Sequence, residues 1–379
     1  MARLGDVCTI VSGTTPKSSC PEYWDGDINW VTPAELNDES NVIYESQRKI
    51  TKQAVVNTSL KSFPAGTVLL SSRAPIGKVA IAGVEMYCNQ GFKNLICSEA
   101  IYNRYLYHFL KNKTEYLNSL GRGATFKEIS KSIVEKIEIP LPPLEEQRRI
   151  AALLDKVSDL IAKRRVQLDK LDLLVKARFA EMFGKTQYPH TALIKLIVEG
   201  AGLSYGIVVP GDNVKDGVPM IRPSDFKNDN LYLEDVYRVA PEIEAKYART
   251  RLIGDEILVQ VIGQPGQVML ADIRCKGMNV TRNLAVIRPN CNRINRIYLK
   301  IYMQTQEAQA FMLGETKQST LKQLPLSRLK ELEIPVPSMA LQEQFAAFVE
   351  QTEKSKLTIQ RSLDKLETLK KALMQQYFG

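Results

Sequence analysis

The sequence predicts a mixed α/β protein with two tandem domains, each followed by a long helix, and three observations support this class. The chain repeats itself: residues 140–184 align without a gap with residues 335–379, and 14 of the 45 positions are identical. Neither copy contains an internal proline or glycine over about 40 residues, which favours one long helix in each. Upstream of each copy, Gly and Pro residues separate short apolar runs that are typical of strands.

The repeat continues upstream of the helical segments and sets the domain boundaries. Residues 125–140 (TFKEISKSIVEKIEIP) correspond to residues 320–335 (TLKQLPLSRLKELEIP). Residues 66–82 likewise correspond to residues 254–271. We therefore expect four segments: an α/β domain over residues 1–139, a central helix over 140–186, a second α/β domain over 187–334 and a C-terminal helix over 335–379.

Short apolar runs between turn residues indicate the strands of each domain. Three such runs stand out in each domain, at residues 68–72, 78–82 and 95–99, and at residues 256–263, 267–272 and 284–289. A helix is expected after the last of these strands, over residues 103–117 in the first domain and 295–312 in the second. These patterns do not fix the order of the strands in a sheet.

The two helical tails carry apolar residues at spacings of three and four, which is the pattern of a coiled-coil seam with several polar interruptions. The predicted seam residues are Ile150, Leu154, Val157, Ile161, Leu168, Leu171 and Val175 in the first tail, and Phe345, Val349, Ile359, Leu363, Leu366, Leu369 and Leu373 in the second. A 40-residue helix is about 60 Å long, and such a helix rarely stands alone on a surface. We expect the tails to pack on each other antiparallel, as two units related by a pseudo-two-fold axis would.

The composition is that of a globular protein with an excess of positive charge. Hydrophobic residues make up 44% of the chain and charged residues 25%, and the net charge is +9. The excess is shared, since residues 1–190 hold 26 Lys+Arg and 21 Asp+Glu, and residues 191–379 hold 25 and 21. An anionic partner would therefore contact both halves. No segment reads as a signal peptide or a membrane span, so we expect a cytoplasmic protein.

Few residues are suited to metal or covalent chemistry. The chain has two histidines, His108 and His190. No C-x-x-C pair occurs among the cysteines, which favours free thiols in a reducing compartment: Cys8, Cys20, Cys88, Cys97, Cys275 and Cys291. The phosphate-binding G-x-x-x-x-G-K-[ST], the dinucleotide G-x-G-x-x-G, the hydrolase G-x-S-x-G and the metalloprotease H-E-x-x-H are missing, as is the Asn/Asp-Pro-Pro-Tyr/Phe run of amino-methyltransferases. The sequence therefore favours a binding protein over an enzyme, and predicts no metal or cofactor site.

Over nearly its whole length, the sequence resembles the specificity (S) subunit of type I restriction–modification enzymes. The resemblance is carried by the segments 125–140 and 320–335 given above and by five further motifs: SSRAPIGKVAI (71–81), IPLPPLEEQRRIA (139–151), SYGIVVPG (204–211), DGVPMIR (216–222) and IPVPSMALQEQFA (334–346). Each motif alone is weak evidence for the resemblance. Their occurrence twice in the same order, with a helical spacer after each variable region, is specific to this family. The second copy has Ala340 and Leu341 where the first has Glu145 and Glu146, so the two copies need not contact a partner in the same way.

The resemblance implies two target-recognition domains, each reading one half of a split double-stranded DNA sequence. It implies that the helices set the distance between the half-sites, and that two methylation subunits dock on the S subunit to form an adenine methyltransferase. S-adenosylmethionine and ATP with Mg²⁺ would be bound by partner subunits, and the resemblance leaves open whether two restriction subunits join. The S subunit itself would be non-catalytic.

Residues suited to DNA contact are the polar and basic ones in Gly-containing loops beside the predicted strands. Arginine suits guanine and glutamine suits adenine in the major groove, whereas lysine more often meets phosphate. The predicted contacts are Arg73, Lys78, Gln90, Lys93, Arg122, Thr125 and Lys127 in the first domain, and Arg222, Gln264, Gln267, Arg282, Lys317, Thr320 and Lys322 in the second.

Two other functions stay open at this stage. A self-contained DNA-cleaving or DNA-modifying enzyme would need a site that none of the familiar motifs reveals, and the scarcity of histidine argues against it. A coiled-coil scaffold that binds only protein would leave the two basic, strand-rich domains without a role. The sequence does not give the target bases or the spacer length.

Overall fold

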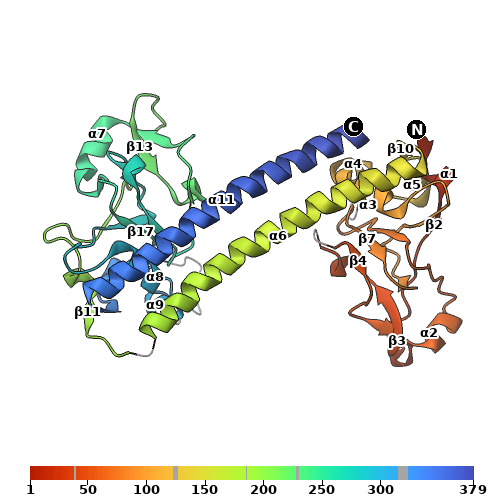
Figure 1. Cartoon of the computed structure of the whole chain (residues 1–379), viewed down its shortest axis with the longest axis horizontal. Helices are drawn as coiled ribbons and strands as arrows, with labels where there is room; N and C mark the ends of the chain where they lie inside the picture. The colour runs from red at the N-terminus through yellow and green to blue at the C-terminus, as the bar shows by residue number, and fades with distance from the viewer. Residues whose placement is uncertain (38–39, 123–126, 185, 228–229, 315–322) are drawn as a thin grey trace. The chain divides into compact units, whose positions relative to one another are not determined.

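The computed structural model describes residues 1–37, 40–122, 127–184, 186–227, 230–314 and 323–379 (Figure 1). The chain forms two compact units. Unit 1 comprises Met1–Val166 and Gln360–Gly379, and unit 2 comprises Gln167–Ile359. The boundary crosses both long helices, α6 (Leu144–Phe183) and α11 (Met339–Phe378). Each unit therefore contains part of both helices.

Unit 1 is built on a five-stranded sheet with the order β2-β9-β6-β7-β4. Its strands are β2 (Cys8–Val11), β9 (Asn94–Cys97), β6 (Val68–Leu70), β7 (Val79–Ala82) and β4 (Val42–Ile43). All neighbours in this sheet are antiparallel except β4 and β7. Two smaller sheets complete the unit: β5-β3-β8 (Lys49–Ile50, Trp24–Val31, Tyr87–Cys88) and β1-β10 (Ala2–Arg3, Glu138–Ile139).

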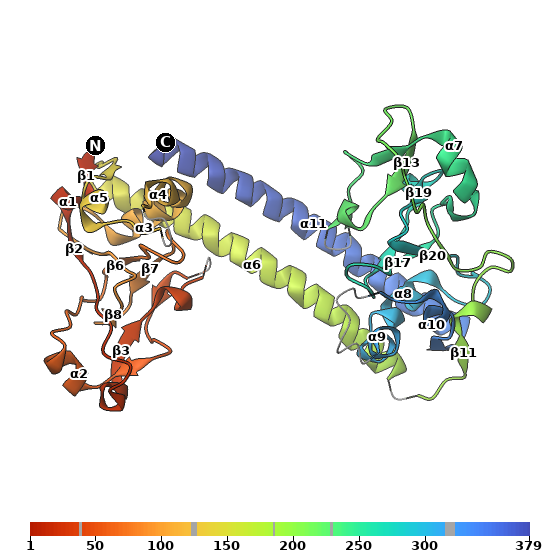
Figure 2. The same cartoon turned by 180° about the vertical axis from the view of Figure 1, so that it is seen from behind.

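The short helices of unit 1 cover the apolar side of the five-stranded sheet, except for α2 (Lys52–Asn57), which packs beside β3 (Figure 2). The others are α1 (Leu4–Val7), α3 (Asn103–Asn112), α4 (Thr114–Leu120) and α5 (Lys131–Glu135). The main core joins sheet residues such as Val68 and Leu95 to Tyr105 and Phe109 of α3. The predicted helix over residues 103–117 is in fact two helices, because the backbone leaves helical geometry at Lys113 (φ −97°, ψ 19°).

Unit 2 has the same plan with different details. Its main sheet has the order β12-β20-β17-β18, made of Ser204–Tyr205, Leu284–Ile287, Ile257–Gln260 and Val268–Leu270. The other sheets are β16-β13-β19 (Tyr237–Val239, Val218–Ile221, Asn279–Val280), β14-β15 (Phe226–Lys227, Asn230–Leu231) and β11-β21 (His190–Ala192, Glu333–Pro335). The helices are α7 (Pro241–Glu244), α8 (Arg296–Met303), α9 (Gln306–Leu313) and α10 (Leu326–Lys330).

The predicted helix over residues 295–312 is also interrupted. Helix α8 ends at Met303, and α9 begins after Thr305, whose hydroxyl accepts a hydrogen bond from the backbone N–H of Ala308 at 3.3 Å. A threonine side chain satisfies a free N–H at a helix start, so this residue begins a second helix. Within the described part of the chain, no helix has both the length and the apolar character needed to cross a bilayer.

Equivalent backbone contacts recur in the two units. The Leu4 N–H donates to the Ile137 carbonyl at 2.9 Å in unit 1, and the Leu193 N–H donates to the Leu332 carbonyl at 2.9 Å in unit 2. Strand β1 pairs with β10 just before α6, and β11 pairs with β21 just before α11. The sequence repeat is therefore a structural repeat, in which the first strand of each unit meets the segment that leads into a long helix.

The long helices pack antiparallel within each unit. In unit 1, Ile150 and Leu154 near the start of α6 share a core with Met374 and Phe378 near the end of α11. In unit 2 the ends are exchanged: the last residues of α6, including Val175 and Phe183, share a core with Phe345 and Val349 at the start of α11.

Most predicted seam residues are removed from solvent. Ile150, Leu154, Val157, Ile161, Val175, Phe345, Val349 and Leu363 are buried, and Leu168, Leu171, Ile359, Leu366 and Leu373 are half-buried. The exception is Leu369, which is 46% exposed, so its assignment to the seam was wrong. Leu369 lies six residues after Leu363, whereas two helical turns take about 7.2 residues, so its side chain is rotated away from the seam. The buried face of the helix includes Met374 instead.

Candidate nucleic-acid interface

Three loops of unit 1 meet beside the main sheet and are called here loop cluster 1: residues 71–78, residues 89–93, and residues 121–122 with 127–129. The Ser72 N–H donates to the Gly91 carbonyl at 2.7 Å, and the Ile129 N–H donates to the Ser72 carbonyl at 3.0 Å. Arg122 and Glu128 exchange two backbone hydrogen bonds of 3.0 and 2.9 Å. These bonds hold residues from distant parts of the sequence in one surface region.

Loop cluster 1 brings together the predicted DNA contacts of the first domain. Arg122, Lys127 and Gln90 are exposed, and Arg73 is half-buried. The Gln90 side-chain oxygen accepts a 2.5 Å hydrogen bond from the Thr15 hydroxyl, so the loop that follows β2 also reaches this region. The predicted contact Thr125 lies outside the described residues.

Two predicted lysines are instead held within unit 1. Lys93 is 6% exposed, and its Nζ lies 3.0 Å from Glu128 Oε1 and 3.3 Å from the Ser72 hydroxyl. Lys78 donates through Nζ to the carbonyl of Leu36. A buried ammonium group needs such partners, because losing its hydration is otherwise very unfavourable. We therefore assign Lys93 and Lys78 a structural role and remove them from the proposed contacts.

Unit 2 repeats the tight loop at the heart of this cluster. In unit 1 the Ser71 N–H donates to the Lys78 carbonyl at 2.9 Å, and in unit 2 the Gln260 N–H donates to the Gln267 carbonyl at 2.8 Å. Gly77 and Gly266 occupy the same position in the two loops with φ of 92° and 91°. Backbone with positive φ favours glycine, so these glycines fix the same loop shape twice.

The matching loops of unit 2 also converge and are called here loop cluster 2: residues 260–267, 281–283 and 323–324. The Val261 N–H donates to the Asn283 carbonyl at 2.8 Å, and the Leu324 N–H donates to the Val261 carbonyl at 2.8 Å. Of the predicted contacts, Gln264 and Arg282 are exposed and Gln267 is half-buried. The predicted contacts Lys317, Thr320 and Lys322 lie outside the described residues.

Arg222 is the remaining predicted contact, and a carboxylate engages it. Its Nη2 and Nε lie 2.8 and 3.3 Å from the two oxygens of Asp225, and this hydrogen bonding raises the pKa of Arg222. The Arg222 N–H also donates to Asp225 at 2.8 Å, as the Thr32 N–H donates to Glu35 at 2.7 Å in unit 1. This recurrence identifies a structural turn, so we remove Arg222 from the proposed contacts.

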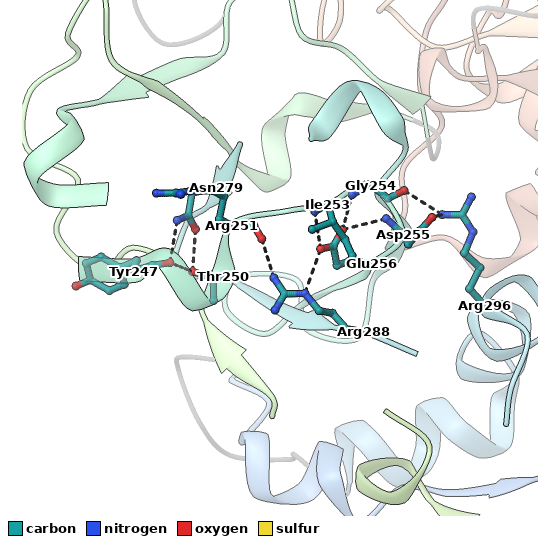
Figure 3. Close-up of polar contacts among 10 residues, drawn as sticks. All are labelled: Tyr247, Thr250, Arg251, Ile253, Gly254, Asp255, Glu256, Asn279, Arg288 and Arg296. Carbon is teal, nitrogen blue, oxygen red and sulfur yellow. Dashed lines mark hydrogen bonds and ion pairs between the residues drawn. The ribbon is translucent and has the colours of Figure 1, made fainter. Parts of the chain in front are cut away.

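Buried polar residues in unit 2 hold the strand that leads to Arg282 (Figure 3). Asn279 of β19 is fully buried; its side chain donates to the Tyr247 carbonyl at 3.0 Å and accepts from the Thr250 hydroxyl at 2.8 Å. Three residues further along the chain, the Arg282 N–H donates to the Ile207 carbonyl at 2.9 Å. The network thus fixes the backbone from which the Arg282 side chain projects.

A second buried group in Figure 3 is the carboxylate of Glu256, the residue that precedes strand β17 of the main sheet. It is fully buried and accepts hydrogen bonds from the N–H groups of Ile253 at 2.8 Å and Gly254 at 2.9 Å, and from Arg288 Nε at 3.2 Å. Several donors around one carboxylate make its burial tolerable. These contacts are structural, and no group of three or more metal-ligating side chains occurs in the described ranges.

The residues that attach each domain to a long helix were not among the predicted site residues. Gln147 and Gln342 are fully buried; their side-chain oxygens accept from the N–H of Tyr102 at 2.9 Å and of Asn295 at 2.8 Å. Their amide groups donate to the carbonyls of residues 142 and 337, each at 2.9 Å. The available signal was the recurrence of this glutamine at the 195-residue offset of the repeat.

Unit 1 has a further attachment through a histidine. His108 of α3 is 2% exposed, and its Nε2 lies 2.9 Å from Asp155 Oδ1 on α6. Arg104 Nη1 lies 2.9 Å from the other oxygen of Asp155. Burial lowers the pKa of His108 despite this carboxylate, and Lys370 and Lys111 lower it further. Burial alone would raise the pKa of Asp155, but its hydrogen bonds with His108 and Arg104 bring it below its usual value.

Curated relatives of this chain are specificity subunits. The MjaIX specificity subunit of Methanocaldococcus jannaschii is 42% identical over 184 residues, covering 48% of this chain and 43% of that protein. The EcoBI specificity subunit of Escherichia coli is 27% identical over 295 residues, covering 69% of this chain and 61% of that protein. The chain thus matches about half the length of these two type I restriction enzyme subunits.

Solved structures with the same fold cover the whole chain. The S subunit of a type I restriction–modification system from M. genitalium aligns with a TM-score of 0.59 at 15% identity, covering 100% of this chain and 95% of that one. A chain from a study of complex assembly and conformational transition in a type I system aligns with a TM-score of 0.57 at 20% identity, covering 100% and 96%. The model of the type I restriction–modification DNA specificity domain matches residues 1–170 and 211–370. The chain therefore belongs to this family and carries its domain twice.

Proposed function

We propose that this protein is the DNA-recognition subunit of a type I restriction–modification complex, and that each unit reads one half of an asymmetric, bipartite site. One observation carries the proposal: the same loop frame occurs in both units and presents different side chains. Counted from the equivalent residues Ser71 and Gln260, Arg73 of the first loop is replaced by Ile262 in the second, and the exposed Pro75 is replaced by the exposed Gln264. A shared loop frame with different side chains suits two domains that recognise two different DNA half-sites.

The chemistry of the exposed residues agrees with DNA as the ligand. Arginine can bond a guanine edge through two N–H groups, and glutamine can bond adenine in the same bidentate way. In unit 1 the proposed contacts are Arg73, Gln90, Arg122 and Lys127, and in unit 2 they are Gln264, Gln267 and Arg282. Thr125, Lys317, Thr320 and Lys322 stay in the proposal on sequence alone. The net charge of +9 favours association with the phosphate backbone.

The long helices complete the proposal. We propose that residues 140–186 and 335–379 set the length of the spacer between the half-sites and dock two methylation subunits, while residues 1–139 and 187–334 recognise DNA. S-adenosylmethionine would then bind to the methylation subunits, and ATP with Mg²⁺ to restriction subunits where these are present. This chain would contribute recognition and no catalytic group, acting in the cytoplasm where the DNA lies.

Reconstitution tests this function against the alternatives. The purified chain, a type I methylation subunit from the same organism, and both together are incubated with tritiated S-adenosylmethionine and genomic DNA. We expect methyl transfer to the DNA only in the sample that contains both proteins. Cleavage or modification by the chain alone would instead identify a self-contained enzyme, and a stable complex without any DNA retention would identify a protein scaffold.

A further inference from the structure

Two cysteines face each other across an edge of the main sheet in unit 1. Strand β2 pairs only with β9 and is the edge strand of the sheet, and their antiparallel register places Cys8 directly opposite Cys97. Cys8 is 7% exposed and belongs to the main core, while Cys97 is half-buried and packs against the same core. Both side chains therefore lie on one face of the sheet, although 89 positions separate them in the sequence.

The hydrogen bonds around this pair show how close the two backbones are. The Cys8 N–H donates to the Leu4 carbonyl rather than to Cys97, and the Ser98 N–H donates to the Val7 carbonyl at 3.0 Å. Cys8 and Cys97 thus form a non-hydrogen-bonded pair, in which the Cα atoms are about 4.5 Å apart. A disulfide bridges Cα atoms that are roughly 4.4–6.8 Å apart, so the pair falls within the required range.

We propose that Cys8 and Cys97 form a redox-modifiable site, which a peroxide converts into an intramolecular disulfide. The half-buried Cys97 thiolate attacks hydrogen peroxide and becomes a sulfenic acid, releasing hydroxide. The Cys8 sulfur then attacks this sulfenic sulfur, the S–S bond forms and water leaves. Overall, two thiols and one peroxide give one disulfide and two waters. A dithiol reductant reverses the reaction by thiol–disulfide exchange.

The surroundings of the pair decide the order of these two steps. The hydrogen bond with Cys97 and burial raise the pKa of Cys8, so the Cys8 thiol remains protonated and unreactive towards oxidant in solution. Its reaction needs a sulfenic acid placed directly opposite, which the register supplies. The resulting bond would tie the edge strand β2 to β9. Val11 and Asn94 at the other end of this ladder lead directly into the loops that hold Thr15 and Gln90.

Peptide mapping under non-reducing conditions tests the site. The full chain is treated with hydrogen peroxide, remaining thiols are alkylated after unfolding, and the digest is analysed by mass spectrometry. We expect a cross-linked peptide pair containing Cys8 and Cys97, loss of alkylation at both positions, and full recovery of both thiols after dithiothreitol. Cys291 is exposed and serves as the internal measure of oxidant exposure.

Three variants define the outcome. C97A should abolish the cross-link and leave Cys8 fully alkylatable, whereas C291A should leave the cross-link unchanged. C8A should convert Cys97 from a disulfide partner into a stable sulfenic or sulfinic acid. The proposal fails if the wild-type chain shows no Cys8–Cys97 peptide at peroxide levels that oxidise Cys291 completely. It also fails if Cys97 is found only in disulfides between chains. The wild-type measurement decides the question even if a variant does not fold.

Discussion

At the scale of single residues, the polar and charged side chains that were predicted to contact DNA fall into two groups. Lys93 and Arg222 are engaged by Glu128 and Asp225, and they hold loops and turns in place. Arg122, Arg282 and Gln264 project from loop clusters 1 and 2 into solvent. Among the described residues, no hydrogen bond or ion pair engages the side-chain donors of the second group, so these donors can meet a phosphate or a base edge without first losing such a bond.

Arg282→Ala tests the contact proposed for unit 2. Loss of one phosphate contact should weaken binding of the assembled complex to its target and lower the slope of log K against log salt by about one unit. Loss of a bidentate guanine contact should instead cost about 1–3 kcal/mol and relax the sequence preference at one position. Fluorescence anisotropy over a salt series separates the two cases. Lys195→Ala removes an equal charge at an exposed position, at the end of the turn Leu193–Lys195, and serves as the control. Equal effects of the two substitutions on binding would refute the assignment of Arg282 to the DNA contact.

His108 makes unit 1 sensitive to acid. Its pKa is lowered in the folded state, so the unfolded chain binds more protons as the pH falls through about 6.5. The folded state is therefore at its most stable relative to the unfolded chain above that pH, and it loses stability below it. At lower pH, protonation of Asp155 causes a further loss of stability. We expect the melting temperature to fall between pH 7.5 and 5.5, and to fall less in His108→Gln. His190→Gln, at an exposed position, should behave as the wild type; identical curves for all three proteins would contradict this.

At the scale of elements, each domain is joined to a long helix by the same set of contacts. The Tyr105 hydroxyl donates to the Pro140 carbonyl at 2.9 Å, and the Tyr298 hydroxyl donates to the Pro335 carbonyl at 2.8 Å. Phe378, at the end of α11, lies 5.1 Å from the ring of Tyr105, and Phe183, at the end of α6, lies 4.9 Å from the ring of Tyr298. Each domain therefore binds the start of one long helix and the end of the other.

Gln147→Ala should loosen this junction in unit 1. The substitution leaves the N–H of Tyr102 and the carbonyl of Pro142, both half-buried residues, and the carbonyl of the exposed Ala100 without their hydrogen-bond partner. Each unsatisfied group costs about 1–3 kcal/mol, so we expect a loss of roughly 2–4 kcal/mol after local relaxation. Urea unfolding followed by circular dichroism measures it. Gln342→Ala should lower the free energy of unfolding by a similar amount, while Gln376→Ala, at an exposed position, should change it little. If Gln147→Ala lowered the free energy of unfolding by less than about 0.5 kcal/mol, the junction would not depend on Gln147.

The elements also show what can be read from the sequence. The long helices were predictable because no glycine or proline interrupts them and their apolar spacing repeats. The structural roles of Lys93 and Gln147 were not, because their partners Glu128 and Tyr102 lie 35 and 45 positions away in the sequence. The loop clusters depend on strand pairing between distant segments, which the local pattern of apolar runs does not determine.

At the scale of the whole molecule, the long helices are proposed to set the spacer between the two half-sites, and the loop clusters are proposed to recognise the bases within each half-site. Deleting residues 163–166 of α6 together with 362–365 of α11 removes about one turn from each helix, or roughly 6 Å. Base pairs rise about 3.4 Å, so we expect a spacer shorter by about two base pairs, with both half-sites unchanged. The methylated motif of a strain carrying this variant reports both quantities. A changed half-site with the original spacer would contradict the division of labour.

The central claim is that this one chain determines a bipartite DNA target. Long-read sequencing that detects methylated bases, applied to the native genome with and without this gene, measures that property directly. Deletion of the gene should remove one asymmetric motif, with adenine methylated in both half-sites, and reintroduction of the intact gene should restore it. Retention of the same motif after deletion, while the methylation subunit is still expressed, would contradict the account.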